Sequence, residues 1–312
     1  MKKYAIGIDL GGRSIKFGLF TEDGELVSKS IVNTRIDDGG KYILPDAYDH
    51  ILKIIDKHQL DSTNLLGIGM GVPGSVTKQR YVNKAVNLGW DFVDIREYFE
   101  DKLDIKILVE NDANVAALGE SWVGIGKDYQ SIVMVTLGTG VGGGIIVDGK
   151  IISGKHGSGG EIGHMPLLKD PLPRTCGCGN NRCFEQVASA TGIENIAHDY
   201  LFENEEDSSL RGLDNITAKD IFDAFEKGDD AAVNIADQYF SHLARGLAII
   251  AAIIDPDAFV LGGGVSNAGE LLLKNVRPYF EKYAFVNNRD VDIKIAELGN
   301  DAGIYGAAKL VL

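Results

Sequence analysis

The stretch that decides the fold runs from residue 4 to residue 33 and reads YAIGIDLGGRSIKFGLFTEDGELVSKSIVN. It predicts three strands, because short apolar runs alternate with turn residues. The strands are Tyr4–Asp9, Ser14–Phe20 and Glu25–Asn33. Gly11 and Gly12 supply the first turn, and Asp23-Gly24 is a favoured hairpin pair. The chain therefore opens with an antiparallel meander.

The same order of features returns in the second half of the chain. An apolar run at Ser131–Thr136 precedes the glycine-rich segment Gly138–Gly144, which we expect to be a turn, and a hairpin turn follows at Asp148-Gly149. A unit that occurs twice indicates internal duplication. Helical and strand patterns alternate after each unit, and this alternation predicts an α/β fold. We expect two similar domains, each aiming a glycine-rich turn at one ligand held in a cleft between them.

The domain boundaries follow from this repeat. The first domain should cover residues 1–117 and be joined by the C-terminal helix, about residues 300–312. The second should cover residues 118–299. A helix is expected from Asp112 to about Trp122 and a long one from Asp229 to Ile254, whereas Gly71–Trp90 and Glu203–Asn215 are expected to be loops.

Composition narrows the classes of partner. The chain has 312 residues, with 45 acidic against 31 basic side chains and a net charge of −14. This balance argues against a broad nucleic-acid or anionic-membrane surface, although a small anion needs only a few local donors. The apolar start at residues 4–8 is too short for a signal peptide, and Leu247–Ile254 is too short to span a bilayer. A cytoplasmic location is expected.

Two familiar nucleotide motifs can be excluded. Gly69–Gly74 and Gly138–Gly143 match the spacing G-x-G-x-x-G, but the dinucleotide fingerprint requires a helix directly afterwards. The first match contains Pro73 and enters a polar loop, and the second enters a hairpin. No Gly-Lys pair is followed by Ser or Thr, so a P-loop is absent as well.

Three glycine-rich loops remain, at Asp9–Lys16, Leu137–Gly144 and Gly262–Ser266. Each alone is explained equally well as a tight hairpin turn. Three of them at strand ends in a duplicated chain favour a nucleotide, because glycine lets backbone N–H groups surround phosphate oxygens. Asp9 is well placed to hold Mg²⁺ through waters, and Lys16 can bring positive charge to the transferred phosphate.

Asp112 follows the expected strand Ile105–Val109 and opens a helix. From the residues alone it is either a catalytic carboxylate or part of a helix N-cap, which Asn111 or Asp112 can supply equally well. These two interpretations stay open at this point.

The only cysteines of the chain lie close together in the sequence, and a histidine precedes the first of them by twelve positions. The pattern is H-x₁₁-C-x-C-x₄-C, formed by His164, Cys176, Cys178 and Cys183. One imidazole and three thiolates make a closed tetrahedral set, which is typical of structural zinc. Three buried reduced cysteines are the alternative, but Gly177 and Gly179 favour a tight chelating loop. We expect a zinc loop over residues 164–185.

Several segments resemble one family. They are Asp9-Leu-Gly-Gly12, Asn111-Asp-Ala-Asn114, Gly160-Glu-Ile-Gly-His164 and the cysteine cluster that ends in Phe184-Glu185. They resemble the ROK family of repressors, open-reading-frame proteins and sugar kinases, whose fold is actin-like (ribonuclease-H-like). Within the family, the segments Ala85–Trp90, Ala188–Gly192 and Leu298–Gly303 resemble those of bacterial ATP-dependent glucokinases.

The resemblance implies an ATP-dependent kinase that transfers the γ-phosphate to the 6-hydroxyl of glucose. Asp112 matches the general base, and the residues that match sugar contacts are Gly74, Asn111, Asp112, Glu161, His164 and Glu185. The expected nucleotide-binding residues are Asp9, Gly11, Gly12, Arg13, Ser14, Lys16, Gly138, Thr139, Gly140, Gly263 and Gly264. ATP, Mg²⁺ and a structural Zn²⁺ are the implied cofactors, and a homodimer or homotetramer is the implied assembly.

One residue departs from the family pattern. The first phosphate loop usually reads Asp-x-Gly-Gly-Thr, and Arg13 stands where the threonine is expected. Either Arg13 contacts phosphate or Ser14 supplies the missing hydroxyl.

Alternative functions also remain. The pocket motif is shared with kinases for fructose, N-acetylmannosamine, N-acetylglucosamine and β-glucosides. A sugar-responsive repressor is less favoured, because it needs a DNA-binding domain before the first strand and a charge suited to DNA. A non-catalytic sugar-binding module would not need Asp112 together with three phosphate-type loops.

Overall fold

The computed structural model describes residues 2–312 and divides into two compact units. Unit 1 runs to Gln130 and also contains Gly144–Gly160 and Glu297–Leu312, and unit 2 consists of Ser131–Gly143 and Glu161–Ala296. We expected the first boundary after residue 117. The contacts instead keep all of α4 (Asp112–Trp122) in unit 1, because this helix packs along the C-terminal helix.

Unit 1 is built on a five-stranded sheet with the order β3-β2-β1-β4-β8. Its strands are β1 (Tyr4–Leu10), β2 (Ser14–Thr21), β3 (Leu26–Asn33), β4 (Leu65–Val72) and β8 (Ile107–Asn111). The first three pair antiparallel, and β4 and β8 continue the sheet in parallel with β1. The predicted opening meander is therefore confirmed.

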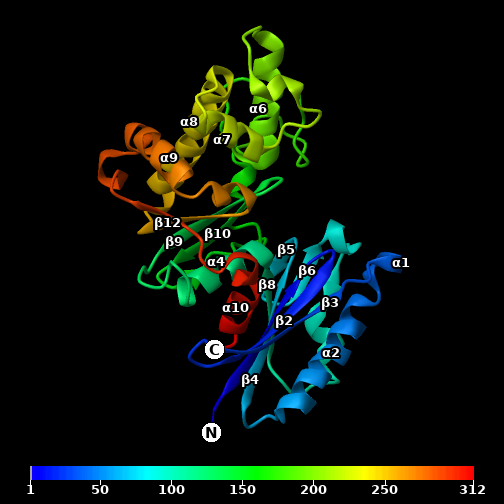
Figure 1. The fold of residues 1–312 in the computed structure, drawn as a ribbon. Helices are drawn as coiled ribbons and strands as arrows, with labels where there is room; N and C mark the ends of the chain where they lie inside the picture. Colours follow the sequence, from blue (N-terminus) through cyan, green and yellow to red (C-terminus); the bar gives the residue numbers. More distant parts are fainter. Residues whose placement is uncertain (1) are drawn as a thin grey trace. The chain divides into compact units, whose positions relative to one another are not determined.

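The two faces of this sheet carry different side chains, because neighbouring residues of β1 point to opposite sides. Ile6 and Ile8 enter the larger core, to which α2 (Ile43–His58) contributes its apolar face. Ala5 lies in a second cluster with side chains of α10 (Ala302–Lys309). Figure 1 shows α10 (red) and α2 (blue) beside this sheet. Unit 1 also contains the short helices α1 (Asp37–Gly40) and α3 (Ile95–Glu100).

Glycines bring α10 unusually close to its neighbours. A Cβ on Gly69 of β4 would lie 1.7 Å from the carbonyl oxygen of Ala307. A Cβ on Gly306 would lie 1.6 Å from the carbonyl oxygen of Val115 in α4. The backbone of α10 thus lies directly against both the sheet and α4.

The second sheet repeats the first. Its strands follow the order β11-β10-β9-β12-β13, which is the third-second-first-fourth-fifth order of the first sheet. They are β9 (Ile132–Leu137), β10 (Val141–Val147), β11 (Lys150–Ile151), β12 (Ala258–Gly262) and β13 (Asp292–Ile295). This shared order confirms the duplicated, actin-like α/β architecture that the sequence predicts.

The helices of unit 2 gather around one long helix, α8 (Asp230–Ile254). The others are α5 (Glu185–Ala188), α6 (Ala190–Glu203), α7 (Ala218–Glu226) and α9 (Glu270–Tyr283). The expected long helix forms with Asp229 as its N-cap, and Thr217 and Asp220 form a capping box at α7. Within residues 2–312, no helix is both long and apolar enough to cross a membrane.

Some expected loops contain regular structure. The segment Gly71–Trp90 holds β5 (Ser75–Thr77) and β6 (Tyr81–Lys84), which form a small sheet with β7 (Val93–Asp94). These strands are too short to show a period-2 pattern. The expected turn Gly138–Gly144 is also shorter than predicted, because Val141 already begins β10. A 3₁₀ turn over Ser209–Gly212 interrupts the expected loop Glu203–Asn215.

Candidate active site

The β1–β2 turn of unit 1 carries the first expected phosphate loop. Gly11 N donates to Ser14 O (3.0 Å), and Thr34 Oγ1 donates to Gly11 O (2.6 Å). The turn is therefore fixed by its own backbone and by the residue that follows β3. The Arg13 carbonyl accepts a further bond from Thr34 N (3.1 Å). The backbone that would meet phosphate therefore has a defined shape.

Asp9 and Lys16 lie directly behind this turn, at register partners on β1 and β2. Lys16 Nζ contacts Asp9 Oδ2 at 3.0 Å and donates to the carbonyl of Asn300 at 2.8 Å. Both side chains are partly exposed, at 23% for Lys16 and 20% for Asp9. The Asp9 carboxylate is a hard oxygen ligand that is held in place and partly exposed to solvent, which fits a hydrated Mg²⁺. Lys16 is held by two partners rather than projecting alone.

The turn between β8 and α4 answers the question that the sequence left open at Asp112. Asn111 is the N-cap, since its Oδ1 accepts from Ala113 N and Asn114 N. Its Nδ2 donates to the carbonyl of Gly74 (3.1 Å), which brings two expected sugar contacts together. Asp112 occupies the next position, exposed in the first turn of α4, and its Oδ1 accepts from Ala113 N at 2.9 Å. The capping role belongs to Asn111, so Asp112 is not needed as the cap.

Gly74 takes a backbone conformation that favours glycine. Its φ is +101°, and a Cβ there would lie 2.0 Å from the carbonyl oxygen of Lys84. The glycine therefore allows the Gly74 carbonyl to face Asn111.

Unit 2 holds the other two glycine loops, and the structure brings them together. Gly263 has a φ of +83°, and its Cβ position is 2.6 Å from the backbone of Leu137. Gly138 directly follows Leu137: its nitrogen donates to Gly140 O, and its carbonyl accepts from Ala190 N at 2.8 Å. A Cβ on Gly138 or Gly264 would meet no described atom within 4 Å, so the space above these backbones is open to a ligand.

The expected sugar-binding side chains of unit 2 form one cluster. His164 Nε2 lies 3.8 Å from Glu161 Oε2, and His164 Nδ1 lies 3.7 Å from Glu185 Oε1. Phe184, the residue before Glu185, packs into the notch left by Gly246 on α8, where a Cβ would lie 2.3 Å from its ring. The buried Tyr239 hydroxyl donates to the carbonyl of Ala188. Helix α5, and with it Glu185, is thereby fixed to α8.

His164 also belongs to the cysteine cluster. One ligand atom each from His164, Cys176, Cys178 and Cys183 lies within 4.8 Å of all the others. His164 Nδ1 is 3.5 Å from Cys176 Sγ, and Cys178 Sγ is 3.5 Å from Cys183 Sγ. A tetrahedral zinc with bonds of about 2.3 Å to sulfur and about 2.0 Å to nitrogen sets sulfur–nitrogen distances of about 3.5 Å and sulfur–sulfur distances of about 3.8 Å. The donor set and its spacing fit such an ion.

The surroundings of the three thiols shift their pKa values in different directions. Burial raises the pKa of the Cys176 and Cys183 thiols. The pKa of Cys178 is lowered to about 7, chiefly by a backbone hydrogen bond from Asn180. A divalent cation among the four ligand atoms would stabilise the thiolate form of all three. With Nδ1 facing the cysteines, Nε2 of His164 is left on the side of Glu161.

A pocket of about 360 Å³ in unit 2 joins several of these residues. Thr139, Gly140 and Glu185 line it, together with four residues at the start of α6 that are not among the expected site residues. They are the N-cap Ser189 and, within α6, Thr191, Gly192 and Asn195. Most of them lie in the Ala188–Gly192 segment, so a sequence signal existed. Ser189 also caps α6, because its hydroxyl accepts from Gly192 N.

A model of the ROK family matches residues 5–312 of the chain. The chain belongs to the ROK family. It is 38% identical to the glucokinase of Halalkalibacterium halodurans, across 99% of this chain and 95% of that protein.

Two solved ROK structures are also similar to this ROK chain. One is the ROK hexokinase of Thermus thermophilus, with a TM-score of 0.82, 30% identity and coverage of 99% and 98% of the two chains. The other is a ROK glucokinase from Streptomyces griseus in complex with glucose and AMPPNP. Its TM-score is 0.74, its identity is 33%, and 98% of each chain is covered.

Proposed function

We propose that this chain is an ATP-dependent hexose kinase that phosphorylates the 6-hydroxyl of glucose. The observation that carries the proposal is the β8–α4 turn, where Asn111 caps the helix and leaves the Asp112 carboxylate exposed beside it. The similarity to glucokinases over nearly the whole chain supports the same activity. Glucose is the preferred sugar in this proposal because the similar chains named above include glucokinases.

The proposed reaction moves one phosphoryl group and one proton. Asp112 accepts the proton of the sugar hydroxyl as its oxygen attacks the γ-phosphorus of ATP. The bond between that phosphorus and the β–γ bridging oxygen breaks, and ADP leaves. Phosphoryl transfer depends mainly on positioning and charge neutralisation, so an oriented carboxylate and backbone-lined loops are sufficient. Asp9 would hold Mg²⁺ through water, which neutralises charge on the phosphates.

The sugar hydroxyls are assigned to Glu161, His164 and Glu185, with Asn111 and Gly74 as further contacts. Carboxylates form the stronger, charge-assisted hydrogen bonds with hydroxyls. In this proposal a structural zinc binds His164 through Nδ1 and directs Nε2 at the sugar, so the metal sets the orientation of a binding residue.

The nucleotide is assigned to the three glycine loops. The β1–β2 turn, with Gly11, Gly12, Arg13 and Ser14, would face the transferred phosphate. Gly138, Thr139 and Gly140 would bind along the phosphate chain, beside Gly263 and Gly264. Their open backbone positions support this assignment.

The test is a coupled ADP-release assay with Mg-ATP against a panel of free hexoses. We expect the highest kcat/KM with glucose and a loss of about 10²-fold or more in kcat for Asp112→Asn, since general base catalysis contributes factors of this size. Asp128→Asn is the matched control, because Asp128 is exposed and outside the proposed site. A different preferred hexose would overturn only the substrate. Full activity of Asp112→Asn would overturn the assignment of the base.

A further inference from the structure

Unit 1 contains a second pocket, of about 460 Å³, that holds none of the residues assigned above to sugar or nucleotide. Lys78, Lys150 and Lys309 line it, together with Gln79, Glu110 and Ser153. We call it the lysine pocket. Val76 and Leu118 add apolar wall. Its volume lies within the range of sites for small metabolites.

The three lysines are not neutralised by the protein. Among the described residues, none of them forms an ion pair; Lys78 and Lys309 instead lie over the rings of Tyr81 and Trp122. Three such cations in one pocket are notable in a chain whose net charge is −14. Glu110 is the only carboxylate in the lining, and it is 2% exposed. The pocket therefore attracts anions.

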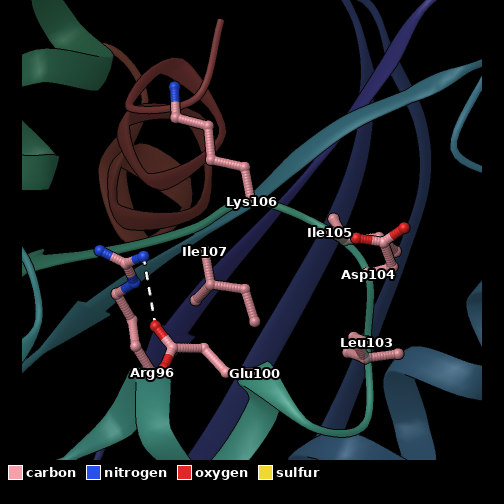
Figure 2. Close-up of a pocket in the computed structure, with 7 residues that line it drawn as sticks. All are labelled: Arg96, Glu100, Leu103, Asp104, Ile105, Lys106 and Ile107. Atoms are coloured by element: carbon pink, nitrogen blue, oxygen red, sulfur yellow. Dashed lines mark ion pairs between the residues drawn. The ribbon is translucent and has the colours of Figure 1, made fainter.

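Another pocket of unit 1 shows the contrast. It has a volume of about 280 Å³ and lies between α3 and the start of β8. Figure 2 shows Arg96 pointing at Glu100 across it, and the two form an ion pair at 3.3 Å. Arg80 contacts the same Glu100 oxygen at 3.2 Å. The lining holds two cations, Arg96 and Lys106, and two carboxylates, Glu100 and Asp104. Its charges are balanced in sign, so that pocket gives no comparable indication of an anionic ligand.

The lysine pocket is also bordered by a strained turn. Lys78 and Gln79, the central residues of the β5–β6 hairpin, have φ values of +55° and +51°. A turn with positive φ at both central residues favours Asn-Gly. A residue with a large side chain destabilises this conformation by roughly 1 kcal/mol per position. The carbonyl of Gln79 accepts from Val109 N at 3.1 Å, which fixes the turn to β8. Strain kept in this way favours a function for the two side chains.

Glu110 connects the wall of the lysine pocket to the β8–α4 turn. Its Oε2 accepts from Ser153 Oγ at 2.7 Å on the pocket side. Its Oε1 accepts from Asn111 N at 2.9 Å and from Asn114 Nδ2 at 3.0 Å. One buried carboxylate thus bonds a pocket residue and the residue that caps α4 next to Asp112.

We propose that the lysine pocket is an effector site for a small phosphorylated metabolite, and that Glu110 couples its occupancy to the Asn111–Asp112 turn. The lysine ammonium group binds phosphate as a point charge. The apolar wall formed by Val76 and Leu118 suits the short carbon skeleton of such a metabolite. Binding of the metabolite to the lysine pocket is independent of the proposed function. An effect of this binding on phosphoryl transfer rests on the proposed role of Asp112.

The binding test uses calorimetric titration of the full chain, without ATP or sugar. The probes are fructose 1,6-bisphosphate and inorganic phosphate. We expect binding that weakens by about tenfold or more in Lys78→Gln/Lys150→Gln/Lys309→Gln, because several charge-assisted contacts are lost. The control, Lys57→Gln/Lys227→Gln/Lys274→Gln, changes the charge equally at exposed lysines elsewhere. Absence of binding by both probes, or equal binding by the two triple variants, would overturn the site.

The coupling test measures amide hydrogen exchange over residues 107–114 with and without fructose 1,6-bisphosphate. We expect slower exchange when the probe is bound to the parent chain. Ser153→Ala removes only the pocket-side bond of Glu110, so it should still bind the probe but lose this protection. Equal protection in Ser153→Ala would overturn the coupling through Glu110. Neither measurement depends on sugar phosphorylation, so failure of the kinase assignment would be seen separately.

Discussion

Single residues divide the work at the β8–α4 turn. Asn111 satisfies the free N–H groups of the helix, and its amide group also donates to Gly74. A helix end needs such a cap, and once Asn111 provides it the next carboxylate can serve another purpose. This separation was not readable from the sequence, where Asn111 and Asp112 are equally good capping residues.

Arg13 is the residue where a prediction can be made most directly. It is exposed at the tip of the β1–β2 turn, and among the described residues its side chain has no ion-pair partner. If the guanidinium contacts the phosphates of ATP, Arg13→Thr should raise the KM for ATP by about fivefold, since an exposed charge contact contributes about 1 kcal/mol. Steady-state kinetics with varied ATP measures this. Lys127→Thr is the control, and an unchanged KM for ATP in Arg13→Thr would leave phosphate binding at this turn to Ser14 and the backbone.

At the scale of elements, glycine serves two purposes that the sequence does not separate. The sequence predicts that glycines of the three loops contact a ligand, and Gly138 and Gly264 do face open space. Gly69 and Gly306, in contrast, allow α10 to touch β4 and α4. Tertiary packing decides which backbone approaches a glycine. The amino-acid sequence alone therefore does not show which glycines contact a ligand and which allow close helix packing.

The close packing of α10 gives a prediction about stability. Gly306→Ala should improve helix propensity by about 1 kcal/mol, but its Cβ would lie 1.6 Å from a backbone oxygen of α4. The backbone of α4 would have to shift to relieve this clash. We therefore expect a net loss of about 3 kcal/mol or more in the free energy of unfolding. Urea denaturation measures it. Gly212→Ala is the control, because a Cβ there meets no described atom within 4 Å, and it should change stability by less than about 0.5 kcal/mol. Equal stability of the two variants would contradict the packing argument.

At the scale of the whole molecule, the duplication was the most predictable feature. Strand, glycine turn and strand recur at Tyr4 and Ser131, and the two sheets have the same strand order. The boundaries of the compact units were harder to predict, since they depend on contacts such as those between α4 and α10. The small sheet β5-β6-β7 was missed, because strands of two to four residues carry too little pattern.

Metal removal tests whether residues 164–185 depend on a bound zinc for their local structure. The loop and the cluster of Glu161, His164 and Glu185 all belong to unit 2, whereas β1 and β4 lie in the separate core of unit 1. A strong chelator should therefore speed amide exchange over residues 161–188 while β1 and β4 keep their protection. Glucose affinity should fall by about tenfold or more, because in the proposed site the metal orients His164 toward the sugar.

Added Zn²⁺ should restore both properties, and elemental analysis should find one zinc per chain in the untreated protein. Purified protein that lacks zinc yet binds glucose fully would contradict this account. It would leave three reduced thiols beside the Glu185 carboxylate, and the sugar cluster would have to be held by α8 alone, through Phe184 and Tyr239.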